Sequence, residues 1–176
     1  MKLTWFGGTT MRIHIGGTIL VMDAEGAPEG IDQAELVSGA DRVFGMGDGL
    51  AAVDSATWRP RRAGRLVDEG ERGNPVEIWA AGEGAVLVDA VGEPPLVLAG
   101  GSLPEPGRWG TEAVFVLFGD GPNMSGLGEA LLDVTAPKLI ALAGDEAAVE
   151  FAIEALRERL DGAGLMSLEA GLAVEV

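Results

Sequence analysis

Cysteine is absent from this chain of 176 residues. That absence excludes a disulfide framework, a thiolate zinc ligand and a cysteine nucleophile. The single histidine, His14, narrows the remaining chemistry further. No apolar run approaches the roughly 18 residues of a membrane-spanning helix. The first ten residues also lack the continuous apolar segment of a signal peptide. We therefore expect a cytoplasmic protein.

Basic residues are scarce, with 12 Lys and Arg against 28 Asp and Glu, a formal net charge of -16. A field of that sign repels phosphate backbones and anionic lipid headgroups. Neither nucleic acid nor a membrane surface is therefore an expected partner. A hydrophobic content of 47% over this length is enough for one compact core. We expect a single domain over residues 1–176.

Short β-type runs separated by Gly- or Pro-bearing turns occupy most of the chain. Each run is rich in branched or aromatic residues. Strands are expected at residues 2–6, 10–15, 18–23, 41–46, 64–69, 76–81, 85–90, 95–100, 113–118, 138–142, 164–168 and 172–176. Helices are expected near 32–36, after Ala51, and at 125–133 and 146–160. This order predicts an α/β fold of two sheets with helices packed outside.

The clearest helix is the one at residues 146–160. Asp145 precedes it as a candidate N-cap, and Gly162 and Gly164 follow it. Its apolar residues recur at approximately helical spacing, which predicts one buried stripe. The expected stripe consists of Ala147, Phe151, Ile153, Leu156 and Leu160.

One basic segment, "WRPRRAGR", interrupts this acidic chain. Its arginines are Arg59, Arg61, Arg62 and Arg65. They are candidates for an anion-binding patch or for the docking edge of an acidic partner. We favour a plainer interpretation, in which charge and proline protect a solvated edge strand from pairing with other chains.

Five segments together carry a family resemblance. They are "WFGGTTMRIHIGGTILVMDA" (5–24), "ADRVFGMGDGLAA" (40–52), "LAGGS" (98–102), "LFGDGPNMSG" (117–126) and "PKLIALAGDE" (137–146). Their order over nearly the whole chain resembles the metallo-β-lactamase fold superfamily. The similarity is to its short bacterial metal-dependent hydrolases, which are similar to ascorbate-phosphate lactonases. The resemblance implies a four-layer αββα sandwich of two mixed sheets flanked by helices.

The family's metal ligands are the histidines and aspartates of these segments. In this chain the seven corresponding positions are Gly8, Gly47, Gly49, Ala51, Ala52, Gly101 and Gly144. Asp23 matches the aspartate that follows the family's first hairpin. A catalytic zinc needs at least three protein donors and one open position for water. Glycine and alanine supply no donor, so the resemblance implies a metal site that has been emptied, and we expect no cofactor.

Two sets of remaining side chains are weaker candidates for metal ligands. Alternation along 10–15 places His14 with Arg12 on the face away from Met11, Ile13 and Ile15, which favours a surface or interface residue over a ligand.

Three aspartates, Asp48, Asp120 and Asp145, lie beside emptied ligand positions. They are candidates for a weak Mg²⁺ or Ca²⁺ site. We favour turn and helix-cap roles for them, because Gly-Asp-Gly is ordinary turn chemistry.

Two functions remain after these exclusions. The first is a non-catalytic module that binds a small ligand or a protein partner in the old cleft. The second is a hydrolase related to metal-dependent lactonases, acting through an unusual metal on the surviving acids or without a metal. Homo-oligomerisation is left open. If the resemblance holds, histidines placed together at positions 47, 49 and 144 should restore zinc affinity.

Overall fold

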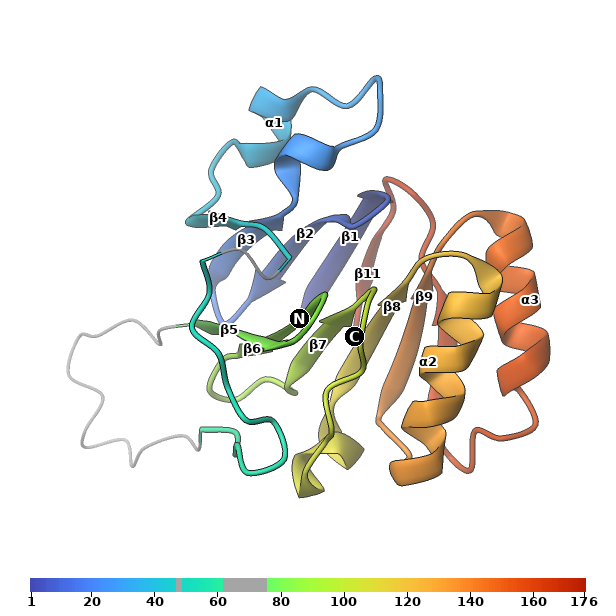
Figure 1. The fold of residues 1–176 in the computed structure, drawn as a ribbon. Helices are drawn as coiled ribbons and strands as arrows, with labels where there is room; N and C mark the ends of the chain where they lie inside the picture. Colours follow the sequence, from blue (N-terminus) through green and yellow to red (C-terminus); the bar gives the residue numbers. More distant parts are fainter. Residues whose placement is uncertain (47–48, 62–75) are drawn as a thin grey trace.

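The computed structural model describes residues 1–46, 49–61 and 76–176. Over these residues the chain forms two mixed β-sheets that pack against each other, with helices on their outer faces (Figure 1). The predicted α/β sandwich of two mixed sheets is confirmed at this level. The strand expected at residues 64–69 lies outside the described residues.

The first sheet combines the N-terminal strands with the last strand of the chain. Its order is β11 (Ala173–Glu175), β1 (Lys2–Gly7), β2 (Thr10–Ile15), β3 (Thr18–Met22) and β4 (Arg42–Phe44). All neighbours are antiparallel except β3 and β4. The predicted alternation along β2 is confirmed where Met11, Ile13 and Ile15 are buried and Arg12 and His14 are partly exposed. Thr10 breaks it, because it is also buried.

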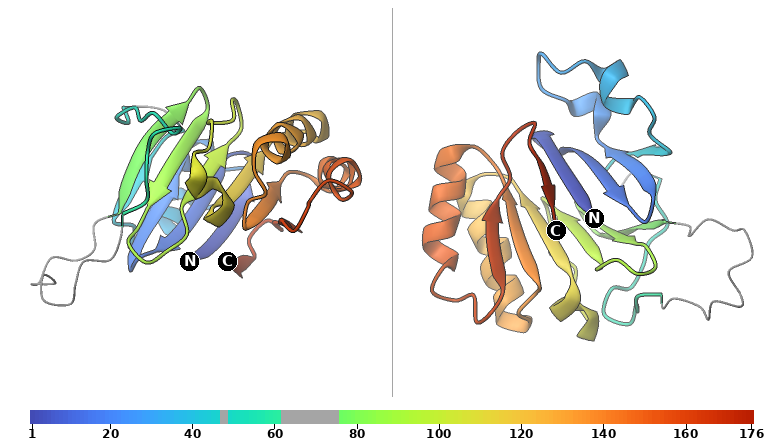
Figure 2. Two further views of the ribbon diagram at one scale, coloured as in Figure 1. Left: turned by 90° about the horizontal axis from the view of Figure 1, so that it is seen from below. Right: turned by 180° about the vertical axis from the view of Figure 1, so that it is seen from behind.

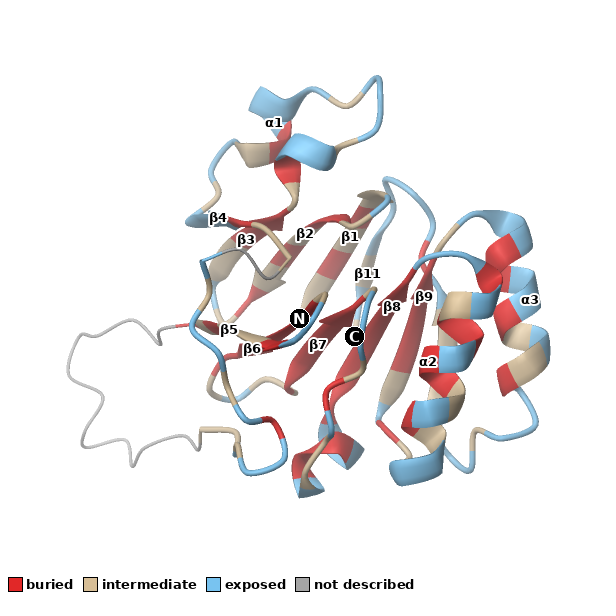
Figure 3. Cartoon of the chain, viewed as in Figure 1, coloured by how far each residue is buried: buried red, intermediate tan, exposed pale blue. Residues whose placement is uncertain are grey.

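The second sheet holds the middle of the chain. Its order is β10 (Gly164–Ser167), β9 (Leu139–Ala143), β8 (Val114–Phe118), β7 (Leu96–Ala99), β6 (Ala85–Asp89) and β5 (Glu77–Gly82). The four strands from β7 to β10 are parallel, and β6 and β5 are antiparallel to their neighbours. Every residue of β6, β7 and β8 is buried, as expected for strands covered on both faces (Figure 3).

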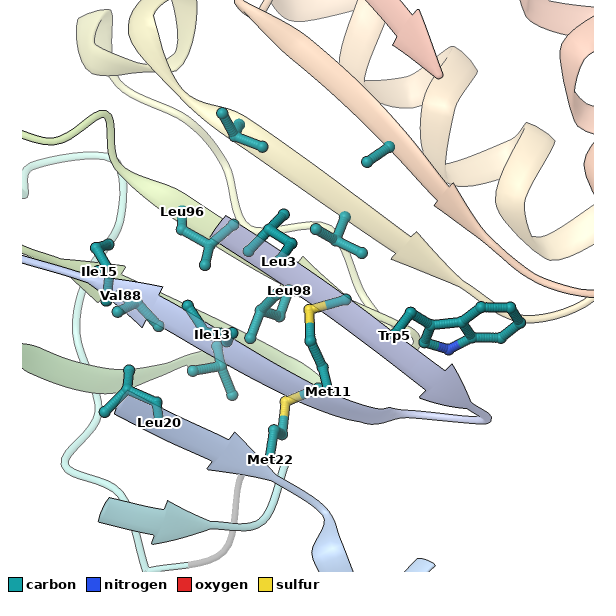
Figure 4. Packing of buried hydrophobic residues seen from close by; sticks show 14 of the residues in the cluster. Leu3, Trp5, Met11, Ile13, Ile15, Leu20, Met22, Val88, Leu96 and Leu98 are labelled. Carbon is teal, nitrogen blue, oxygen red and sulfur yellow. The ribbon is translucent and has the colours of Figure 1, made fainter. Parts of the chain in front are cut away.

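The main core lies between the two sheets. Inward side chains of β1, β2 and β3 meet those of β6, β7 and β8 in one cluster, in which Leu3, Ile13 and Leu20 face Val88 and Leu98 (Figure 4). Each of these five side chains is fully shielded from solvent. Burying an aliphatic side chain of this size stabilises the fold by about 1.5–3 kcal/mol.

Two helices, α2 (Gly121–Val134) and α3 (Glu146–Leu156), cover the outer face of the second sheet (Figure 2). α2 begins four residues earlier than predicted, because the Asp120 side chain accepts a hydrogen bond from Asn123 N at 2.9 Å and Pro122 fits a first helical turn. The predicted cap of α3 is confirmed, since Asp145 Oδ1 accepts from Ala148 N at 2.8 Å.

No helix in the described ranges is long and apolar enough to cross a membrane.

The predicted buried stripe of α3 is confirmed at Leu156 and partly at Ile153, but it was wrong at Ala147 and Phe151. Phe151 is 52% exposed and Ala147 is exposed, whereas the buried residues are Ala148, Val149, Ala152 and Leu156. α3 packs closely on α2 through this face, because Gly128 leaves room for Leu156: a Cβ at Gly128 would lie 2.6 Å from Leu156 Cδ1. The helix also ends at Leu156 rather than at residue 160.

A small helical layer lies on the outer face of the first sheet. It consists of the short helix η1 (Ala24–Gly26) and α1 (Gln33–Val37), which starts as predicted near residues 32–36. Leu36 and Ala24 pack on Val21 of β3. The guanidinium of Arg12 donates to the Leu36 carbonyl at 2.6 Å, which ties α1 to β2.

The helix predicted after Ala51 was also wrong. Residues 50–61 form no helix and lie beside β5, where Ala80 N donates to Ala51 O at 3.0 Å and Val53 N donates to Ala80 O at 2.9 Å. This segment covers a part of the second sheet that α2 and α3 leave open. It is anchored by Trp58, whose ring packs edge to face on that of Trp109 with 5.1 Å between the ring centroids.

Candidate functional site

A pocket of about 1040 Å³ opens at the end of the sandwich where β1, β7, β8 and β9 finish. We call it the strand-end pocket. Ligands of α/β proteins commonly bind outside the carboxyl ends of parallel strands, and β7, β8 and β9 are parallel. The described residues that line it are Trp5, Gly7, Gly8, Thr9, Met46, Glu83, Gly84, Gly100, Gly101, Ser102, Phe118, Gly119, Asp120, Ala143, Gly144 and Asp145.

The structure brings three of the seven predicted ligand positions together in this pocket. Gly8 follows β1, Gly101 follows β7 and Gly144 follows β9, and all three line the same hollow. These three glycines are far apart in the sequence. They become neighbours because the two sheets bring the ends of their strands together.

Three other positions lie elsewhere, and a fourth is not described. Gly49, Ala51 and Ala52 are exposed, and none of them is among the lining residues. Ala52 instead forms an isolated parallel bridge with Ala80 of β5. Gly47 lies outside the described residues, although its neighbour Met46 lines the pocket.

At two of the convergent positions the backbone itself forms the wall. A Cβ at Gly101 would lie 2.5 Å from the Glu83 carbonyl oxygen, and a Cβ at Gly144 would lie 2.8 Å from that of Gly119. Gly8 differs, because no atom lies within 4 Å of its added Cβ. Glycine at 101 and 144 is therefore required by close packing of the loops. A histidine at position 144 would fit only if the Gly119 loop moved. The expected restoration of zinc affinity by histidines therefore does not hold for the loops as they are packed.

Substituting Gly144 by alanine should therefore destabilise the protein, although glycine-to-alanine changes at unstrained sites usually stabilise. We expect a loss of about 1–3 kcal/mol, the usual cost of overpacking. Gly126→Ala is the matched control, because that Cβ meets nothing within 4 Å in the middle of α2. It should gain about 0.5–1 kcal/mol. Urea unfolding of both variants measures the difference, and equal stability would contradict the close packing at 144.

Hydrogen bonds lock the loops around the pocket. Asn123 Nδ2 donates to Gly100 O at 3.1 Å and to Phe118 O at 2.9 Å, which joins the ends of β7 and β8. Ser102 donates to the Glu83 carbonyl from its amide at 2.7 Å and from its hydroxyl at 2.9 Å. Asn123 was not among the predicted site residues, and its place just after an expected strand was the signal that could have found it.

Apolar side chains form the floor of the pocket. Trp5 and Phe118 are 8% and 2% exposed, and Met46 lies partly buried beside them. Figure 4 shows the Trp5 ring at the end of the core cluster, beyond the aliphatic side chains. Its Nε1 donates to the Gly8 carbonyl at 2.9 Å, so the indole is held in place.

Three carboxylates, those of Glu83, Asp120 and Asp145, add negative charge to the lining. None of the described lining residues is basic. Asp120 and Asp145 also cap α2 and α3, so their predicted cap roles are met in the structure. The third member of the candidate cation site, Asp48, lies outside the described residues.

The residues present do not fit the zinc that the resemblance would bring. The convergent positions carry no donor, and two of them have no space for a side chain. Within the described ranges, no group of three or more His, Cys, Asp or Glu side chains is placed to hold a metal ion. Asp23 has a structural role instead: its carboxylate accepts from Met46 N at 2.9 Å, and it adopts a left-handed conformation with φ 48°.

His14 is distant from the pocket. In the sheet it pairs with Lys2, at the start of β1, whereas the pocket lies at the other end of that strand. The separation is on the order of 15 Å along the strand. At that distance the imidazole cannot act as a general base on a ligand in the pocket. Partial burial, followed by the charges of Lys2 and Arg12, lowers the pKa of His14.

The basic segment divides into two parts. Arg62 and Arg65 lie outside the described residues, and Arg59 is exposed. Arg61 is not the solvated residue of an edge strand that we predicted: its Nε lies 2.6 Å from Asp89 Oδ2, and Asp89 is fully buried. Its main contact is thus structural.

Comparison of the chain with models of protein families, with curated proteins and with solved structures found no match.

Proposed function

We propose that this protein is a non-catalytic member of the metallo-β-lactamase fold that binds a small ligand in the strand-end pocket. The observation that carries the proposal is the pocket itself. It contains three of the seven positions that the resemblance assigns to metal ligands, and glycine backbone and apolar side chains line it in place of metal donors.

The size and construction of the pocket favour a small ligand over a protein partner. Small-molecule sites are concave, mostly apolar, and of about 300–1,000 Å³. The strand-end pocket has about 1040 Å³, with Trp5, Met46 and Phe118 among its walls. The hydrogen bonds of Asn123 and Ser102 hold its loops in place before a ligand arrives. Such preorganisation reduces the entropy lost on binding.

The alternative is a hydrolase related to metal-dependent lactonases, working through the surviving acids or without a metal. Hydrolysis at neutral pH needs an activated nucleophile, supplied by a metal-bound water or by a side chain next to a base. In the pocket, the Ser102 hydroxyl donates to a main-chain carbonyl and the imidazole of His14 is out of reach. Binding therefore has more support than catalysis.

Metal content separates the binding function from a metal-dependent hydrolase. Protein purified without chelator should contain well under one equivalent of zinc, iron or manganese after dialysis, because the convergent positions offer no donors. Its melting temperature should not change on addition of EDTA, since no binding energy of a metal would contribute to folding. One retained equivalent, or a fall of several degrees with EDTA, would favour the hydrolase.

Ligand binding can be tested by blocking the pocket. In two-dimensional NMR spectra, neutral fragments that carry a phenyl ring should shift the amide signals of Gly101 and Gly144. Thr9→Trp should abolish these shifts, because Thr9 lines the pocket beside Gly100, with its Cγ2 3.9 Å from a Cβ built there, and an indole at position 9 would fill part of the pocket. Thr4→Trp, on the outer face of β1, is the matched control. Equal shifts of the amide signals in both variants on addition of the fragments would contradict the proposed site.

A further inference from the structure

We infer that the ligand of the strand-end pocket is an organic cation, an ammonium group carried on an apolar body. The inference rests on the proposed function and adds the chemical class of the ligand. It follows from the combination of an aromatic floor with a lining whose charged side chains, among the described residues, are all acidic.

The floor offers a cation the right kind of surface. Trp5 and Phe118 both line the pocket, and tryptophan is the side chain that attracts cations most strongly through its π-system. The hydrogen bond from Trp5 to Gly8 keeps the indole ordered in the free protein. Met46 adds a polarisable, adaptable apolar wall for the body of the ligand.

The charge balance of the lining is negative. Glu83, Asp120 and Asp145 contribute three carboxylates. The N-termini of α2 and α3 oppose them with roughly half a positive charge each, so a net charge of about -2 remains. The capping bonds of Asp120 and Asp145 use Oδ1 in each case, and these bonds do not engage Oδ2.

Other ligand classes fit this lining less well. An anion would meet the three carboxylates with no basic side chain from the described lining to balance it. A bare metal ion would need donors grouped at one point, and the described residues provide no such group. A cation with an apolar body fits both the separated carboxylates and the volume of the strand-end pocket.

Three probes that share a phenyl body test the charge directly. They are benzyltrimethylammonium, its uncharged carbon analogue neopentylbenzene, and the anion phenylmethanesulfonate. Titrations followed by the NMR signals of Gly101, Gly144 and the Trp5 indole give each affinity. The cation should bind roughly tenfold more tightly than the carbon analogue, and the anion more weakly than both. The preference should fall as salt is raised.

Charge-neutral variants locate the source of the preference. The triple variant Glu83→Gln, Asp120→Asn and Asp145→Asn removes the three charges, while asparagine preserves the helix caps. It should reduce at least fivefold the ratio of the affinity for the cation to the affinity for the carbon analogue. The matched control replaces three exposed acids outside the pocket, Glu154, Glu158 and Glu169, by glutamine. It changes the net charge equally and should retain the preference.

Each outcome has one meaning. If the carbon analogue or the anion binds at least as tightly as the cation, the inferred ligand class is wrong while the binding function stands. An equal loss in the control variant would also overturn the inference, because net charge alone would then explain the preference. If no probe and no neutral fragment binds, both the inference and the proposed function fail. Should the triple variant not fold, Glu83→Gln alone tests the same point, since Glu83 lies in an exposed turn.

Discussion

Replacing Arg61 by alanine is expected to destabilise the protein by about 3–5 kcal/mol, the usual cost of removing one partner from a buried ion pair. Arg61 Nε lies 2.6 Å from Asp89 Oδ2, and one of its terminal nitrogens donates to the Asp89 main-chain carbonyl at 2.9 Å. The Asp89 side chain is only 1% exposed, and its Oδ1 has no hydrogen-bond partner among the residues that the structure describes. Without Arg61 the carboxylate would remain buried with its principal partner gone.

Thermal and urea unfolding measure this loss, which corresponds to a fall in melting temperature on the order of 10 °C. Arg59→Ala is the matched control, because Arg59 is exposed, and it should change stability by about 0.5 kcal/mol or less. The double variant Arg61→Ala with Asp89→Ala should be more stable than Arg61→Ala, since it no longer buries a charge. Equal losses of stability in Arg61→Ala and Arg59→Ala would show that the ion pair between Arg61 and Asp89 does not stabilise the fold.

Replacing Trp109 by alanine should cost a similar amount, about 3–5 kcal/mol, through the cavity it leaves. Trp109, in the short helix η2 (Arg108–Glu112), is 5% exposed and stacks on Phe115 at 6.3 Å. Trp58 meets it edge to face, and the Nε1 of Trp109 donates to Ser55 O at 2.9 Å. The side chain thus joins the outer face of β8 to the segment 50–61.

Two further variants are comparisons for Trp109→Ala. Trp109→Phe keeps most of the ring volume and should lose less stability than Trp109→Ala. Phe151→Ala removes an aromatic side chain that is 52% exposed, and it should cost less than about 1 kcal/mol. The three melting temperatures, compared with that of the parent, test the order. If Phe151→Ala costs as much as Trp109→Ala, the cluster does not anchor the segment 50–61.

The sequence by itself determined most of the strands. Alternation at residues 10–15 and the apolar run at residues 113–118 are local patterns, and each is set by which faces of a strand must be buried. The cap at Asp145 was equally readable, because a cap depends only on the few residues that follow it, whereas the start of α2 at Gly121 after Asp120 was missed. Local patterns suffice where the interaction itself is local.

The tertiary structure decided matters that depend on neighbours from distant parts of the chain. The burial of Ala148 and Ala152 in place of Phe151 is set by the packing of α3 on α2, where Gly128 leaves room for Leu156. An alanine-rich helix carries too weak a stripe to choose that face alone. In the same way, the segment after Ala51 is held beside β5 and by the Trp58–Trp109 contact rather than coiling into a helix.

The strand-end pocket combines both kinds of information. The resemblance groups seven positions from the sequence, and of these the folded chain brings Gly8, Gly101 and Gly144 to the pocket, whereas Gly49, Ala51 and Ala52 lie elsewhere. Only the folded chain shows that a Cβ at Gly101 or Gly144 would meet a carbonyl oxygen of another loop. The aromatic floor and the acidic lining likewise arise where the ends of several strands meet in space, and no single stretch of sequence contains that geometry.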